Sequence, residues 1–392
     1  MFHLNEGQEE IVRQAVDWYN NSSEQVFQFS GAAGTGKSVV MNAIINRLGL
    51  NMYDIAPMSY IGSAAIIMRL KGLINAKTIH SWLFEPKVVH EGDYDPYLGR
   101  KKSKLVFVPK PLGDKKLICI DEAGCVPYSL KKEIESRGVK VLACGDLNQL
   151  PPVGDMRPAY LYTGKVHFLT EIMRQSQNSP IVYLAHRLLN GYPIAPGIYG
   201  QVLVVCDDEI TTDMIYNSEV VLCGRNSTRD KFNKYIRQRL FNIDSPLPLH
   251  GEKLVCRKNN WRLESDGINL ANGLIGSVYN YPDITGFNGK TFKIDFKPSM
   301  IDSPFKDVNV DYKYFSANTE EKRLIKKNPY AKGEKFEYAY SLTTHIAQGS
   351  QYRQGLYFQE YLNKMYNRNL NYTGITRFSD RCIYVIPHPK YF

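Results

Sequence analysis

The chain has 392 residues, with 49 Lys and Arg against 39 Asp and Glu, which gives a formal net charge of +10. This length accommodates two or three domains, and the positive charge suits a polyanionic partner such as nucleic acid, although a basic surface also serves solubility alone. The sequence has no signal-peptide pattern at its N-terminus, no apolar run near the ~18 residues of a membrane span, and no C-x-x-C pair among its seven cysteines. We therefore expect a cytoplasmic protein with reduced thiols and without a membrane segment or a zinc site.

The first predicted element is a helix over residues 4–19, where Ile11, Ala15 and Trp18 recur at helical spacing. Gln8 lies in this segment, upstream of the glycine-rich stretch described next. A side-chain amide can pair with the edge of an adenine, but residue chemistry alone favours an ordinary surface glutamine.

Residues 31–38 read Gly-Ala-Ala-Gly-Thr-Gly-Lys-Ser and fit the phosphate-loop pattern G-x-x-x-x-G-K-[ST] at every fixed position. A β-prone run over 26–30 precedes the loop and an apolar helical pattern over 38–48 follows it, so backbone N–H groups and a helix N-terminus point at a polyphosphate. These flanks favour a nucleoside triphosphate site over an ordinary glycine turn. Lys37 would reach the β/γ oxygens, and the Ser38 hydroxyl would bind Mg²⁺. The predicted contacts are Gly31, Ala32, Ala33, Gly34, Thr35, Gly36, Lys37 and Ser38.

Two elements follow the loop, a strand over residues 52–57 and a helix over 63–70. Residues 78–83, Thr-Ile-His-Ser-Trp-Leu, predict a loop that enters a short helix. His80 in this loop either stacks on a nucleic-acid base or is a capped histidine of the fold, and the residues leave both interpretations open.

Residues 85–113 differ in character from the segments around them. Two β-prone runs, 87–89 and 105–108, flank a polar link that is rich in basic and aromatic residues and includes Tyr94 and Tyr97. This pattern predicts a long β-hairpin with a basic, aromatic tip, and a disordered insertion is the alternative.

Residues 117–122, Leu-Ile-Cys-Ile-Asp-Glu, predict a buried parallel strand that ends in two carboxylates. Next to a phosphate loop, the first carboxylate, Asp121, holds Mg²⁺, and the second, Glu122, orients and deprotonates an attacking water. A second apolar strand covers 139–146. Because helices and apolar strands alternate through this region, the predicted fold class is α/β with a parallel sheet.

The order of these motifs resembles that of superfamily-one helicases, in the subclass of RecD and the phage Dda helicase. Gln8 matches the adenine-reading glutamine of that subclass, and residues 78–81 resemble the motif that touches the DNA strand. Residues 145–151 resemble the motif whose glutamine, here Gln149, senses the γ-phosphate. Residues 169–175 resemble the motif with an arginine finger, here Arg174.

The second half of the chain carries the remaining motifs of this resemblance. Residues 341–350 are similar to the T-x-H-x-x-Q-G-x element, which spans DNA and nucleotide. Residues 372–377, Tyr-Thr-Gly-Ile-Thr-Arg, resemble the closing Y-x-G/A-x-T-R motif, with Arg377 as the other arginine finger. Residues 251–255 and 272–278 resemble a small SH3-like barrel.

The resemblance implies an α/β fold with two RecA-like P-loop motor domains, over 1–180 and 181–392, that share one ATP site. It implies a strand-separating pin at 85–113 and an SH3-like insertion at 250–335. The implied activity is ATP-dependent unwinding of DNA, with ATP and Mg²⁺ as cofactors and single-stranded DNA, DNA forks, and replication or recombination proteins as partners. A phage protein acting in a bacterial host would fit this reading. The implied catalytic residues are Lys37, Glu122, Gln149, Arg174 and Arg377, the further nucleotide contacts are Gln8 and Gly349, and the nucleic-acid contacts are Pro57, His80, Tyr94, Tyr97, Thr344 and His345.

Two segments bear on how DNA would be held. Residues 56–63 replace the A-P-T-G stretch of the family with Ala-Pro-Met-Ser-Tyr-Ile-Gly-Ser, so only Pro57 is carried over as a contact. Gln149 is followed by Leu-Pro-Pro-Val, which offers no aromatic ring to a base and resembles the subclass that moves 5′→3′. The alternative is that Tyr60 or Trp82 does the stacking and that direction is not encoded in this loop.

Two other classes of function compete with a helicase. A different P-loop enzyme, such as a kinase, would leave Gln149, Arg174, Arg377 and residues 341–350 unexplained. A non-catalytic clamp usually lacks Lys37 or the catalytic carboxylate, and this chain keeps both. Action on RNA, or on protein–DNA complexes, remains open as a variant of the first hypothesis.

Overall fold

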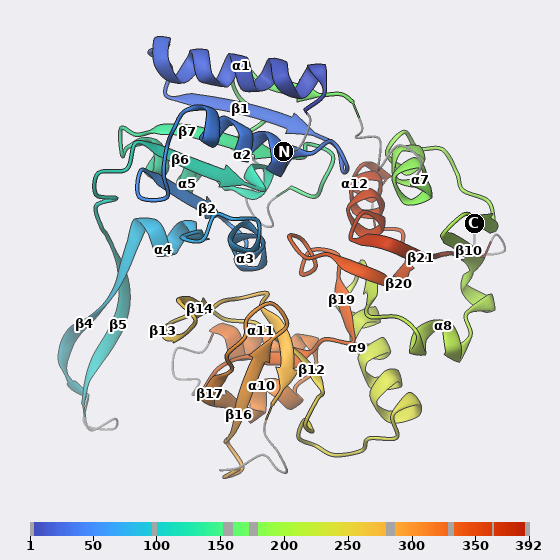
Figure 1. The fold of residues 1–392 in the computed structure, drawn as a ribbon. Helices are drawn as coiled ribbons and strands as arrows, with labels where there is room; N and C mark the ends of the chain where they lie inside the picture. Colours follow the sequence, from blue (N-terminus) through green and yellow to red (C-terminus); the bar gives the residue numbers. More distant parts are fainter. Residues whose placement is uncertain are drawn as a thin grey trace.

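The computed structural model describes residues 4–95, 100–151, 160–171, 179–279, 287–327, 333–362 and 364–388. Within these ranges, the strands form two six-stranded sheets, one five-stranded sheet and two hairpin pairs. The two larger sheets, each with its helices, stand side by side in Figure 1, and the five-stranded sheet lies beneath them.

The first sheet has the strand order β3-β2-β6-β7-β1-β8, and its pairings are parallel. Its central strands are continuous apolar runs, which is the pattern of a strand covered on both faces. The α/β prediction is confirmed here. The strands are β1 (Val26–Gly31), β2 (Ile55–Ser59), β3 (Lys77–Thr78), β6 (Leu117–Asp121), β7 (Lys140–Gly145) and β8 (His167–Leu169). The helices are α1 (Glu6–Asn21), α2 (Lys37–Arg47), α3 (Gly62–Leu70), α4 (Ile79–Leu83), η1 (Ala123–Cys125) and α5 (Tyr128–Glu135).

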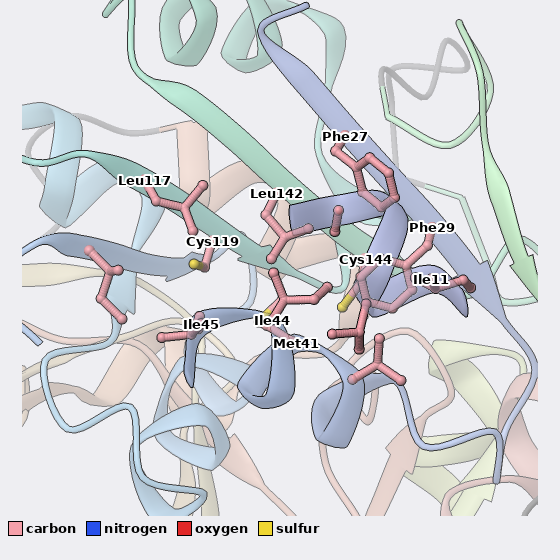
Figure 2. Packing of buried hydrophobic residues seen from close by; sticks show 14 of the residues in the cluster. Ile11, Phe27, Phe29, Met41, Ile44, Ile45, Leu117, Cys119, Leu142 and Cys144 are labelled. Atoms are coloured by element: carbon pink, nitrogen blue, oxygen red, sulfur yellow. The ribbon is translucent and has the colours of Figure 1, made fainter. Parts of the chain in front are cut away.

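Both faces of this sheet are packed. On one face, Met41 and Ile44 of α2 lie against strand residues such as Phe29 and Leu142 (Figure 2). Alternate strand residues, including Ile120, point into a second buried cluster on the opposite face. The carboxyl ends of the strands are therefore held rigidly, and the phosphate loop and the two carboxylates follow directly from these ends.

The second sheet has the order β19-β11-β20-β21-β10-β9 and is parallel except for the edge strand β9. Its strands are β9 (Gly197–Tyr199), β10 (Val202–Cys206), β11 (Val221–Cys223), β19 (Ser341–Thr343), β20 (Tyr352–Phe358) and β21 (Phe378–Ile386). Its helical elements are α7 (Pro180–Leu189), η2 (Asp207–Glu209), α8 (Thr212–Tyr216), α9 (Asn226–Tyr235), η3 (Ile236–Leu240) and α12 (Lys364–Ile375). The last strand of the first sheet is β8, and the elements around the second sheet begin with α7. The exact domain limits, 1–180 and 181–392, stay predictions.

An antiparallel sheet of order β17-β16-β15-β12-β18 is inserted between β11 and β19 in the chain. It has its own apolar core, and its last strand connects to the second sheet through a buried carboxylate, Glu337. Burial acts to raise the pKa of Glu337, but Arg257, Arg229 and Lys322 outweigh burial and lower it to about 2. The elements are β12 (Lys253–Cys256), β13 (Asn260–Ser265), β14 (Ile268–Leu270), β15 (Ile275–Val278), β16 (Thr291–Pro298), β17 (Phe305–Asp311), α10 (Tyr312–Ser316), α11 (Thr319–Lys327) and β18 (Phe336–Tyr338).

A long hairpin of β4 (Phe84–Asp95) and β5 (Arg100–Pro109) extends away from the first sheet (Figure 1). Its antiparallel register runs from Phe84 opposite Pro109 to Asp95 opposite Arg100. The expected hairpin is thus present as a structural element. Of its two predicted contacts, Tyr97 and the side chain of Tyr94 lie outside the described residues.

Candidate functional site

A cavity of about 280 Å³ lies between the two larger sheets and is called the ATP cavity below. Its lining combines groups that lie far apart in the sequence. The first sheet and its loops supply Gly34, Gly36, Lys37, Ser38, Asp121, Glu122 and Gln149, and the second supplies Gly349, Ser350 and Arg377. The structure therefore brings most of the predicted nucleotide residues together around one space that neither half encloses alone.

The phosphate loop has the backbone that its glycines allow. Gly34 and Gly36 have φ of 84° and 81°, a conformation that residues with a Cβ rarely adopt. A Cβ at Gly31 would lie 2.3 Å from Thr35 Oγ1, so this position also requires glycine. Lys37 Nζ donates to the carbonyls of Gly31 at 2.8 Å and Ala32 at 3.1 Å, which keeps the ammonium over the loop at the cavity wall.

Gln8 is almost fully buried and is bound to the phosphate loop. Its Nε2 donates to the Thr35 carbonyl at 2.9 Å, and its Oε1 accepts from Asn5 N at 3.1 Å. Asn5 Oδ1 accepts in turn from Gln8 N at 2.8 Å, which forms a capping box at the start of α1. The surface glutamine alternative is wrong, because only 1% of Gln8 is exposed. Adenine reading stays a prediction, and it would require Gln8 to exchange one of these bonds.

The two carboxylates follow β6 as expected. Asp121 accepts from Glu122 N at 2.9 Å, and Glu122 has a φ of 54°, a left-handed conformation that is uncommon away from glycine. Burial is the main cause that raises the pKa of Glu122, with the Asp121 charge second, while Arg377 and Lys37 act in the opposite direction. A carboxyl with a raised pKa beside a phosphate loop suits the role of general base.

The remaining predicted nucleotide residues face the cavity from its two sides. Gln149 is 5% exposed, and within the described part of the chain its Oε1 has no hydrogen-bond partner. Arg377 is held at the end of α12, where Nε donates to the Thr373 carbonyl at 3.1 Å and Nη1 to the Ser350 carbonyl at 3.3 Å. Arg174 lies outside the described residues, so its role stays a prediction.

The donor set fits Mg²⁺. Ser38 and Asp121 supply hydroxyl and carboxylate oxygens to the same cavity, and Mg²⁺ prefers a few such oxygens together with water and phosphate ligands. Lys71 also lines the cavity, and its Nζ donates to Ser38 Oγ at 3.1 Å. Sequence reasoning missed Lys71, because no motif marks a lysine at the end of a helix.

A second space, of about 390 Å³ and called the aromatic cavity below, lies between the first sheet, the antiparallel sheet and the segment after β19. It brings together His80 and His345, two of the predicted nucleic-acid contacts. The His80 ring centroid is 6.3 Å from that of Tyr60 and 6.2 Å from that of Trp261, and burial lowers the pKa of His80. The Trp261 ring centroid is also 5.9 Å from that of Phe107, at the base of the hairpin.

His345 contacts Tyr366 through a hydrogen bond, and burial lowers its pKa. Two other predicted contacts do not line the aromatic cavity. Thr344 is fully buried and donates to the Cys223 carbonyl at 3.2 Å, and Pro57 is buried in β2, where its carbonyl accepts from Trp82 Nε1 at 2.7 Å. Trp82 is therefore tied to the fold, whereas Tyr60 lines the cavity.

Sequence reasoning missed the contribution of the insertion between β11 and β19 to this cavity. Three residues that no motif had indicated line it from the link after β12 and from β13, namely Arg257, Asn259 and Trp261. Asn272, which the resemblance placed in the SH3-like segment without a contact role, lines it after β14. The stretch 257–262, Arg-Lys-Asn-Asn-Trp-Arg, does carry a signal, because basic and amide side chains around an aromatic ring are typical of nucleic-acid contacts.

No described helix is long and apolar enough to cross a membrane, and among the described residues no group of three or more His, Cys, Asp or Glu side chains could hold a metal ion. All seven cysteines are described, and each is a buried free thiol.

Comparisons with known proteins bear on the family and the fold of this chain. The profile of the AAA-domain family matches residues 3–200, just over half of the 392 residues. The ATP-dependent RecD2 DNA helicase of Deinococcus radiodurans is 25% identical over 380 residues, which cover 90% of this chain and 46% of that protein. This chain spans between 36% and 56% of the length of the curated relatives it matches.

Solved structures of Pif1 helicases share the fold. That from Candida albicans matches with a TM-score of 0.55 at 18% identity and covers 100% of this chain and 97% of its own. The Bacteroides Pif1 helicase in complex with ADP-AlF3 and single-stranded DNA matches with a TM-score of 0.55 at 17% identity, over 100% and 96% of the two chains. The two parallel sheets are therefore RecA-like domains arranged as in the Pif1 fold.

Proposed function

Since this chain belongs to the AAA-domain family and is a superfamily-one helicase of the Pif1 and RecD type, we propose that it hydrolyses ATP to move 5′→3′ along single-stranded DNA and to unwind duplex DNA. The observation that carries the proposal is the composite ATP cavity, in which a phosphate loop and its carboxylates face Gly349 and Arg377 of the other RecA-like domain. Hydrolysis then depends on how the two domains sit against each other, which is the requirement for a motor.

Within this cavity each group has a chemical task. Lys37 and the loop N–H groups bind the phosphates, and Glu122 takes the proton of the attacking water. Arg377 stabilises the charge that develops on the γ-phosphoryl group, and Arg174 is proposed as a second such arginine. Ser38 and Asp121 would hold Mg²⁺, which would neutralise part of the phosphate charge.

The aromatic cavity is the proposed site for the DNA strand. Flat rings of His80, Tyr60 and Trp261 offer stacking surfaces, and Asn259 and Asn272 offer polar groups beside them. Because burial lowers the pKa of His80, its ring is neutral at physiological pH and contributes by stacking rather than by charge. The Bacteroides relatives are described as bound to single-stranded DNA, which supports this ligand class.

The remaining parts of the proposal concern the two insertions and the polarity. The β4–β5 hairpin is proposed as the pin that splits the duplex, and the antiparallel sheet as the SH3-like module beside the strand. The 5′→3′ direction is supported by the RecD2 likeness and by Leu150 and Pro151 after Gln149, which offer no ring to a base. Replication and recombination proteins remain proposed partners.

The test is ATP turnover with and without single-stranded DNA, followed by unwinding of a tailed DNA duplex. We expect turnover to rise severalfold with DNA and strand separation to require ATP. Turnover that ignores DNA would favour another P-loop enzyme, DNA binding without turnover would indicate a clamp, and equal stimulation by RNA would widen the substrate class.

A further inference from the structure

One buried hydroxyl connects three segments that meet at the ATP cavity. Tyr372, in α12, is fully buried. Its hydroxyl accepts a hydrogen bond from Ala33 N of the phosphate loop at 2.8 Å and donates one to Asp146 Oδ2 at 2.6 Å. Both partners belong to the first RecA-like domain, whereas Tyr372 belongs to the second.

The same face of α12 holds the loop that carries Gln149. Asn369, Tyr372 and Thr373 are spaced i, i+3 and i+4, so they share one side of the helix. Asn369 Nδ2 donates to the Asn148 carbonyl at 2.9 Å, and Thr373 Oγ1 accepts from Leu150 N at 3.1 Å. Asn369 Nδ2 also lies 3.5 Å from the Gln149 carbonyl, so with the bond from Tyr372 to Asp146, four hydrogen bonds connect α12 to residues 146–150.

The end of α12 also carries Arg377, whose guanidinium donates to the Thr373 carbonyl. A change in the position of α12 relative to the phosphate loop therefore moves Arg377 and the Gln149 loop together. We propose that Tyr372 is a positioning residue that fixes the second RecA-like domain against the phosphate loop, so that Arg377 and Gln149 reach the nucleotide in register. This inference rests on the proposed function, because it assigns Tyr372 a task in ATP hydrolysis.

Only a residue that both donates and accepts can make this connection. The Tyr372 hydroxyl satisfies the Ala33 N–H and the Asp146 carboxylate at once, and a hydrogen bond to a buried carboxylate is among the stronger kinds. Phenylalanine keeps the ring but removes the hydrogen-bond partner of Ala33 N and of Asp146 Oδ2, while Asp146 Oδ1 keeps its bond from Asn148 N at 2.9 Å. The loss of both bonds across the interface favours separation of the two domains. The binding groups of the phosphate loop itself remain in place.

The first test compares Tyr372→Phe with Tyr357→Phe. Tyr357 is a matched control, because it is equally buried in the same domain and its hydroxyl donates to Asn371 at 2.9 Å within that domain rather than across to the other one. With saturating single-stranded DNA, we expect kcat of Tyr372→Phe to fall about tenfold and its KM for ATP to change by less than about threefold. Both constants of Tyr357→Phe should stay within about twofold of the wild type. Equal kcat in the two variants would overturn the inference. A loss of kcat that parallels a loss of folding stability in both variants would also overturn it, because the effect would then be structural.

A second test does not depend on turnover. All seven native thiols are buried, so cysteines introduced at exposed positions can be labelled selectively. Tyr53 and Ile198, which are 85% and 79% exposed and lie on different domains, are suitable positions for a pair of dyes. We expect Tyr372→Phe to lower the energy transfer between the dyes and Tyr357→Phe to leave it unchanged. If the wild type failed to hydrolyse ATP, the proposed function would fail while this comparison still decided the inference. Equal transfer in wild type and Tyr372→Phe would refute the link.

Discussion

Glu122 occupies a position where one charge controls both chemistry and stability. Its pKa is raised by burial and by Asp121, so the ionised form that acts as a base is held at a cost in folding free energy. We expect Glu122→Gln to bind ATP but to hydrolyse it at least ~100-fold more slowly, because the amide cannot take a proton. Near-wild-type turnover would show that Glu122 is not the base.

The same variant also makes a prediction about thermal stability. A raised pKa in the folded state gives a stability contribution that is present at low pH and is lost as pH rises through that pKa. The wild type therefore loses stability at high pH, where Glu122 is ionised in its buried position. Glutamine does not ionise, so the gain in melting temperature of Glu122→Gln over the wild type should be larger at pH 8 than at pH 5.

Arg377 gives a second prediction at the scale of a residue. Arg377→Ala should cut ATP turnover by ~10³-fold or more and leave nucleotide affinity within about tenfold, because an arginine finger acts mainly on the transition state. Since the Arg377 charge lowers the pKa of Glu122, any residual activity should lose its acid limb at a higher pH than the wild type. Arg381→Ala, which removes an exposed arginine of the following strand β21, is the control. Unchanged turnover in Arg377→Ala would refute the composite site.

Trp261 tests the aromatic cavity. Trp261→Ala should weaken binding of single-stranded DNA about tenfold, because stacking of one base contributes ~1–3 kcal/mol. Tyr192→Ala, which removes an exposed ring far from the cavity lining, should bind like the wild type. Anisotropy of a labelled oligonucleotide measures both, and equal affinities would place the strand elsewhere.

At this scale the sequence predicted most of the residues that gather around the ATP cavity and fewer of those that line the aromatic cavity, while their roles stay predictions. The residues of the phosphate loop are consecutive in the chain, and so are the two carboxylates that follow β6. Local sequence therefore determines the geometry within each of these two segments. Trp261 and Lys71 reach their cavities through tertiary packing, which spacing does not show. Thr344 matched a motif, yet its side chain is buried in the core. A sequence motif identifies the segment but does not show which of its side chains face outward.

The hairpin is the element whose role is easiest to isolate. Replacing residues 94–104 with a short glycine-serine turn keeps its base, where Phe84 and Phe107 lie near His80. We expect DNA-stimulated ATP turnover to survive, because the ATP cavity is elsewhere, and unwinding of a forked duplex to fall strongly. Neutralising Arg100, Lys101 and Lys102 to Gln separates the loss of charge from the loss of the wedge. Loss of both activities in the shortened hairpin would make the segment part of the core fold.

Most elements of the first sheet were predictable because each carries a local signal. The apolar runs of β6 and β7 and the helical spacing in α1 and α2 gave boundaries within a few residues of those observed. The strand expected over 52–57 begins instead at Ile55, because residues 51–54 form a turn in which Asn51 and Asp54 side chains accept backbone N–H groups. The antiparallel sheet was less visible, since it is closed by the pairing of β12 with β18, at opposite ends of the insertion.

For the whole molecule, the sharpest prediction is the direction of movement. Partial duplexes with a single-stranded tail on one end only, assayed at low salt so that binding is not limiting, should be unwound when the tail is 5′ and not when it is 3′. The prediction rests on the Gln149 loop continuing as Leu150 and Pro151, which offer no aromatic ring to a base. Unwinding that requires a 3′ tail would overturn the assignment.

The contact between the two RecA-like domains at Gly349 has a consequence for processivity. Gly349 has a φ of 71°, and a Cβ there would lie 3.0 Å from Ala64 Cβ, so the domains meet with almost no side chain between them. His345, at the aromatic cavity, is four residues before Gly349 in the same segment. Opening this contact to release ADP therefore disturbs the hold on the strand as well. We expect the protein to dissociate from DNA mainly at product release. Added ADP, which delays that step, should then increase the time that each run lasts while it lowers the speed of movement.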